Sequence, residues 1–211
     1  MERVTQTIAK SIFGKNFIGS KELHIFFGVM GSQCSLINLP DINIPLNKLM
    51  MYSKDYILIY GKSSINGNIL NIRHLRDKFG IDPLSFEPCF YNQDWYINET
   101  FITKSLEDRW YLIRKNVINS SRGIPFGELK KDNIMFPTAI LCAYTFFAYY
   151  FVRHSALWKG DYIWCSDCDH NGDQIYVGRY IDAEGMNKNG FSIHRYLSLK
   201  SCYCAVDGLK I

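Results

Sequence analysis

Residues 162–180 read YIWCSDCDHNGDQIYVGRY, and this stretch decides the fold of the C-terminal third of the chain. Residues 162–164 and 174–180 are rich in Tyr, Ile and Val, which favour strands. The Asp, Asn and Gly residues between them have the composition of a tight turn. Further short strands are predicted at 191–195 and 202–206. The C-terminal third is therefore expected to be a set of short strands joined by polar loops that display side chains.

The segment before these strands is strongly apolar. Residues 134–152, IMFPTAILCAYTFFAYYFV, contain no charge, and Pro137 is in a position favoured at the start of a helix. The helix that follows has about 16 residues and a length of ~24 Å, short of the ~30 Å apolar core of a bilayer. We therefore predict a buried core helix and no membrane insertion.

The N-terminal half mixes helical and strand patterns, so the fold class is α+β. The boundary is set at residue 86, with an N-terminal α+β extension at 1–85 and a second domain at 86–211, although the two parts could share one core. The predicted elements are helices within 4–27 and at 71–79, loop at 28–50, and strands at 56–60 and 110–114.

Charge and cysteine content limit the function and the location. The 211-residue chain has a net charge of +4 without a run of five basic residues, so nucleic acid is not an expected partner. The first residues have no apolar signal region. Seven cysteines, an odd number, are expected to be reduced, which predicts a cytoplasmic protein, with another secretion route left open. The oligomeric state is also left open.

Two sets of residues are candidate metal ligands. Oxygen ligands at alternate positions before a glycine resemble the first half of a calcium loop; these are Asp167, Asp169, Asn171 and Asp173. The twelfth position is Gly178 instead of the usual Glu, and a polar hairpin turn is the alternative. A zinc site is the weaker candidate, because a Cys-x-Cys pair is a poor zinc knuckle and strand cysteines often pack in the core. Its ligands would be Cys165, Cys168, Cys202 and Cys204.

No catalytic motif is found, so no catalytic residue is predicted. A metal-dependent enzyme that acts on nucleic acid, of the restriction-nuclease type, remains an alternative. It would use His170 and His194 with neighbouring Asp residues, or the carboxylates Asp94 and Glu99. A structural or interaction subunit, whose partner covers the aromatic cluster at Trp95, is a further alternative.

Several segments occur in an order that resembles a protein family. They are FYNQDWYINETF (90–101), RWYLIRKNVINSSR (109–122), FPTAILCAYT (136–145), WCSDCDHNGDQIYVGRY (164–180) and NGFSIHRYLSLKSC (189–202). Between about residues 86 and 206 the chain is similar to bacterial variable proteins of diversity-generating retroelements, whose C-terminal part is a C-type lectin-like domain.

This resemblance implies a C-type lectin-like C-terminal part, in which a helix is followed by short antiparallel strands. It implies a protein or glycan ligand and no turnover. The ligand-binding residues would be the exposed side chains of the C-terminal strands and loops, namely Asp169, His170, Asn171, Asp173, Arg179, Asn187, Asn189, His194 and Tyr196.

Overall fold

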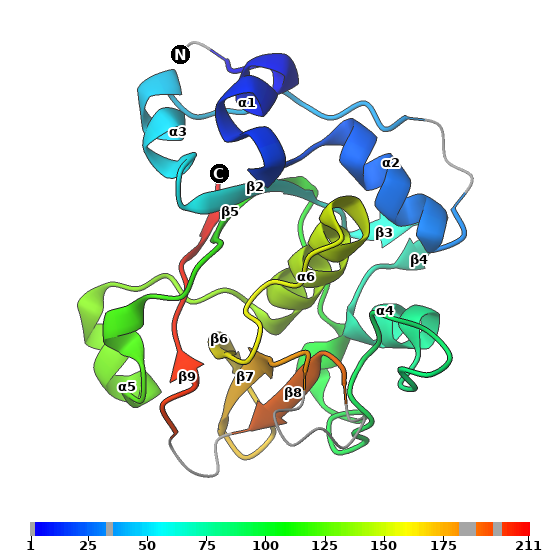
Figure 1. Cartoon of the computed structure of the whole chain (residues 1–211), viewed down its shortest axis with the longest axis vertical. Helices are drawn as coiled ribbons and strands as arrows, with labels where there is room; N and C mark the ends of the chain where they lie inside the picture. The colour runs from blue at the N-terminus through cyan, green and yellow to red at the C-terminus, as the bar shows by residue number, and fades with distance from the viewer. Residues whose placement is uncertain (1–2, 33–35, 182–188, 196–199) are drawn as a thin grey trace.

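The computed structural model of the chain describes residues 3–32, 36–181, 189–195 and 200–211 (Figure 1). Its helices are α1 Gln6–Phe13, α2 Ser20–Val29, α3 Leu46–Tyr52, α4 Ile72–Phe79, α5 Phe126–Leu129 and α6 Ala139–Arg153. Its strands are β1 Phe17–Ile18, β2 Tyr56–Gly61, β3 Ser64–Ile65, β4 Asn68–Ile69, β5 Arg109–Arg114, β6 Tyr162–Cys168, β7 Gln174–Gly178, β8 Ser192–Arg195, β9 Tyr203–Cys204 and β10 Gly208–Lys210. Short 3-10 helices lie at Gly14–Asn16, Thr100–Thr103, Asn119–Ser121 and Lys130–Asp132. The α+β class is confirmed.

The first sheet has the strand order β1-β2-β5-β10. Strand β2 pairs with β5 in antiparallel register along its whole length, from Tyr56 opposite Arg114 to Gly61 opposite Arg109. The last strand, β10, pairs with the other edge of β5. Strands from residues 1–85 and from residues 86–211 therefore share one sheet, and one hydrophobic core extends from Val4 to Val206.

The second sheet has the strand order β8-β7-β6-β9, with β7 antiparallel to both β6 and β8. Helix α6 lies between the two sheets (Figure 1). It is buried continuously from Ala139 to Tyr149, and the Tyr144 hydroxyl donates to the carbonyl of Tyr60 in β2 at 3.0 Å. The predicted buried helix is confirmed, and no helix in the described ranges is long and apolar enough to cross a membrane.

The prediction of loop throughout residues 28–50 is wrong at both ends, because α2 continues to Val29 and α3 begins at Leu46. Pro45 precedes this helix with an extended backbone, as proline favours at a helix start. The helix has seven residues and buries only Leu49. Two turns with one buried side chain leave no helical periodicity in the sequence.

Candidate functional site

The turn between β6 and β7 is organised by the buried carboxylate of Asp169. Its Oδ1 accepts from the backbone N–H of Asn171 at 2.9 Å and of Asp173 at 2.8 Å. The Asp169 N–H donates to the Asp173 carbonyl at 3.0 Å. Desolvation, the largest single contribution, raises the pKa of Asp169, but the backbone N–H bonds from Asp173 and Asn171 and the hydrogen bond from Arg195 hold this pKa below its usual value. The predicted polar turn is present, with Asp169 inside it and His170 and Asn171 exposed at its tip.

A segment far away in the sequence supports this turn. Glu99 is buried, and its Oε2 accepts from the His170 N–H at 3.0 Å. The second oxygen, Oε1, lies 2.5 Å from His170 Nδ1. The His170 side chain is 67% exposed, whereas that of Glu99 is 7% exposed. The His170 imidazole is therefore exposed to solvent, and the buried Glu99 carboxylate fixes its position.

Strand β8 adds Arg195 to the same region. Its guanidinium donates to Asp169 Oδ2 at 3.3 Å and lies 5.4 Å from the centre of the Trp95 ring. The Trp95 indole N–H donates to the carbonyl of Ile193 in β8 at 3.0 Å. We call Trp95, His170, Asn171, Asp173 and Arg195 the turn face. Three chain segments, brought together by folding, contribute to it.

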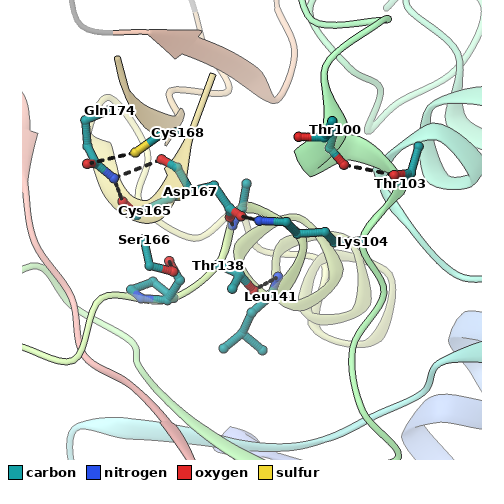
Figure 2. A network of polar contacts seen from close by, with 12 residues as sticks. Thr100, Thr103, Lys104, Thr138, Leu141, Cys165, Ser166, Asp167, Cys168 and Gln174 are labelled. Carbon is teal, nitrogen blue, oxygen red and sulfur yellow. Dashed lines mark hydrogen bonds and ion pairs between the residues drawn. The ribbon is translucent and has the colours of Figure 1, made fainter. Parts of the chain in front are cut away.

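Asp167 is directed at Lys104 and at the start of α6 (Figure 2). Its Oδ2 accepts from the N–H of Ala139, the first residue of α6, at 2.7 Å, and its Oδ1 accepts from Lys104 at 2.9 Å. The structure therefore separates Asp167 from Asp169 and does not assemble the predicted calcium set. In the part of the chain that the structure describes, one group of three or more His, Cys, Asp or Glu side chains is close enough to share an ion, and it consists of Glu99, Asp169 and His170.

The four cysteines proposed as zinc ligands do not form such a group. Cys165 is buried in the core, where desolvation and the neighbouring Cys142 raise its thiol pKa well above its ordinary value. Cys168 is exposed beside Gln174 (Figure 2). Cys204 is buried and Cys202 is partly buried. Cys165 and Cys204 therefore pack in the core, as the alternative to a zinc site predicts for strand cysteines.

Arg179 and His194 lie on a different surface from the turn face. Both contact Tyr162, on the side of the second sheet that carries a second hydrophobic cluster. The His194 ring stacks on Tyr176 with centroids 5.5 Å apart, and the Gln93 amide nitrogen lies 3.2 Å from its ring nitrogens. The predicted binding residues are therefore divided between two surfaces, and His170 and His194 have separate neighbours.

Burial, with a smaller contribution from the charge of Arg179, lowers the pKa of His194 to about 4. The unfolded chain, with a histidine pKa near 6.5, binds this proton more tightly. Stability is therefore expected to fall as the pH drops from about 6.5 towards 4, by about 2 kcal/mol after allowance for partial exposure. His194→Phe keeps the stacked ring and should flatten this pH dependence in urea unfolding. His24→Gln, on the exposed side of α2, should leave it unchanged, and equal slopes in wild type and His194→Phe would contradict the assignment.

The remaining predicted positions fall elsewhere. Asn189 is half-buried, and its side-chain nitrogen is 3.5 Å from Glu87. Asn187 and Tyr196 lie outside the described residues. The acidic pair of the nuclease alternative is also divided, because Asp94 forms an ion pair with Arg76 while Glu99 binds His170.

No sequence pattern predicts Glu99 or Arg195 at this turn, and Trp95 is predicted only as part of an aromatic cluster. Glu99 is 71 residues from His170 in the sequence, and Trp95 is 98 residues from Ile193. The sequence feature that could have indicated Trp95 and Glu99 as site residues is the high density of polar and aromatic residues at 90–101. No family model, curated protein or solved structure matches the chain.

Proposed function

We propose that this chain is a C-type lectin-like binding protein that recognises a protein or glycan through the turn face, without turnover. In this proposal it is similar to the variable proteins of diversity-generating retroelements. His170, Asn171 and Asp173 make direct contacts, together with Trp95 and Arg195. Asp169, which is buried, positions these residues instead of touching the ligand.

The observation that carries the proposal is the combination of exposed recognition groups with a buried polar support. Arg195 and His170 have side chains that are 37% and 67% exposed, and each contacts a carboxylate that is at most 7% exposed. Trp and Arg are enriched among residues that dominate binding energy. Side chains already held in place lose less conformational entropy when a ligand binds. The turn face is thus suited to specific binding.

The arrangement of the C-terminal elements supports the proposed fold. Helix α6 is followed directly by β6, β7 and β8, which are antiparallel neighbours, and this is the helix-then-strands order expected from the resemblance. The six described cysteines are free thiols, which is compatible with the cytoplasm as the proposed location.

The test uses the purified full chain, fluorescently labelled, on a glycan array and on a library of displayed peptides. Any ligand found is then titrated against Asn171→Ala/Asp173→Ala. We expect this double variant to bind about 10- to 100-fold more weakly, as is typical when well-placed polar contacts are lost. The backbone N–H groups of both residues, which stabilise the turn, remain in the variant.

The matched control is Asn68→Ala/Asp77→Ala, which removes the same two side-chain types from exposed positions in β4 and α4. It should bind like the wild type. Unchanged binding by Asn171→Ala/Asp173→Ala would reject the turn face as the contact surface. Hydrolysis or other conversion of the bound ligand by the wild-type chain would contradict a function without turnover.

A further inference from the structure

Glu99, Asp169 and His170 form a compact group of charged side chains under the turn face. One potential ligand atom from each residue lies within 4.8 Å of the others. Both carboxylates are buried, whereas the imidazole is exposed. Two carboxylates and one imidazole are donors that zinc and related divalent ions accept in proteins. The group is therefore chemically suited to a metal and open to solvent on one side.

The charges in this group also favour a cation. Two carboxylates buried together are costly unless positive charge compensates them. Among the described residues, Asp169 is paired with Arg195 through a long contact of 3.3 Å. Glu99 is paired with His170. The two buried carboxylates are thus compensated only by side chains that are themselves 37% and 67% exposed, so a bound cation would add to their compensation.

We propose that Glu99, Asp169 and His170 bind one divalent transition-metal ion of the Zn²⁺ type, with a fourth coordination position open to solvent. The ligands are Glu99 Oε1, Asp169 Oδ2 and His170 Nδ1. This inference concerns metal binding by the chain alone and does not depend on the proposed recognition of a protein or glycan.

Both carboxylates can bind the ion without giving up their support of the turn. Asp169 Oδ1 keeps its two bonds to the turn N–H groups, and only the 3.3 Å contact of Oδ2 with Arg195 is replaced. Arg195 retains its position over Trp95. Glu99 Oε2 keeps the His170 N–H, which leaves Oε1 for the metal.

The imidazole must move slightly. His170 Nδ1 now lies 2.5 Å from Glu99 Oε1. Tetrahedral coordination with bonds of about 2.1 Å separates two ligand atoms by roughly 3.4 Å. An exposed ring at the tip of a turn can make this shift without disturbing the core. A metal binds the unprotonated Nδ1, so any proton on this nitrogen is released to solvent when the metal binds.

A transition metal fits this site better than calcium. Ca²⁺ takes six to eight oxygen ligands, and the first oxygen ligand of the calcium hypothesis, Asp167, is bound to the start of α6. Imidazole nitrogen is a preferred ligand of Zn²⁺, Ni²⁺ and Cu²⁺. The participation of His170 therefore selects a different class of ion from the one that the Asp-rich turn predicts.

The experiment titrates the full chain, first stripped with EDTA, with CoCl₂ as a spectroscopic probe and then with competing ZnCl₂. We expect one Co²⁺ per chain, with visible d–d bands and no thiolate charge-transfer band in the near ultraviolet. His170→Ala should weaken binding by at least ~100-fold and Glu99→Gln by at least ~10-fold, since even residues outside the coordination shell contribute this much. The His170 side chain is exposed, so its loss should leave the fold intact by circular dichroism.

Two controls test whether the ion binds elsewhere. His24→Ala removes another exposed histidine, and Cys168→Ser removes the exposed thiol of β6; both should bind Co²⁺ like the wild type. The proposal is overturned if the wild type binds no Co²⁺ or Zn²⁺, if His170→Ala binds normally, or if Cys168→Ser abolishes binding. No ligand of the turn face enters this titration, and Asn171 and Asp173 are not proposed metal ligands. Failure here is therefore distinguishable from failure of the proposed function.

Discussion

Phe147→Ala is expected to lower the free energy of unfolding by about 4 kcal/mol, in the range found for truncation of a buried aromatic residue. Phe147 is fully buried in the middle of α6. Its ring stacks on Phe79 of α4 at 4.5 Å and lies 4.9 Å from Phe90 and 5.9 Å from Phe191. The substitution would leave a cavity where α6, α4 and the start of the β8 segment meet, so that contacts to several segments are lost together.

Urea unfolding followed by far-ultraviolet circular dichroism measures this loss. Phe86→Ala is the matched control, because Phe86 also packs on Phe79, at 6.1 Å, but is 41% exposed. Its loss should cost about 1 kcal/mol, since little apolar area leaves water on folding. Similar losses for the two variants would show that α6 is not the centre of the core.

Asp167→Ala is expected to cost about 3 kcal/mol, near the upper end for a hydrogen-bonded charged group. The carboxylate is 3% exposed and is bound both to the first N–H of α6 and to Lys104. A negative charge at this end of a helix is also favoured by the helix dipole. The substitution removes all three interactions from the junction between β6 and α6 (Figure 2).

Lys104→Met separates these contributions. The Lys104 side chain is 55% exposed, and without it Asp167 is still compensated by the Ala139 N–H and the helix dipole, so loss of the ion pair should cost only about 1 kcal/mol. We therefore expect Lys104→Met to unfold at nearly the wild-type urea concentration, whereas Asp167→Ala unfolds much earlier. If both variants lose the same free energy of unfolding, the ion pair and not the contact with α6 is the main interaction of Asp167.

The elements with strong local signals could be predicted from the sequence. Helix α4 begins after Asn71, whose side chain accepts from the His74 N–H, and ends at Gly80 with a positive φ. The uncharged run before residue 152 predicts α6 because its length suits a core helix. Strand β10 could not be predicted, since its three residues gain their strand conformation only from pairing with β5.

The turn could be predicted from its sequence, but the direction of each side chain could not. The calcium hypothesis requires the side chains of Asp167, Asp169, Asn171 and Asp173 to face one point. In the structure the β6–β7 register shifts between Trp164 and Cys168, and such irregularities re-aim side chains. Asp167 therefore faces α6. The contacts of Glu99 and Arg195 with the turn depend on tertiary packing, for which a single sequence carries no local pattern.

The shared first sheet has a consequence for modular use of the chain. A fragment that begins at residue 86 would retain β5 and β10 but would lose β2, the partner that covers the other edge of β5. That edge would present a row of unpaired backbone groups, available for pairing with another chain. The turn face, which we propose as the binding surface, is therefore not expected to fold without residues 1–85. Grafting the turn face onto another protein therefore requires that the N-terminal strands be transferred with it.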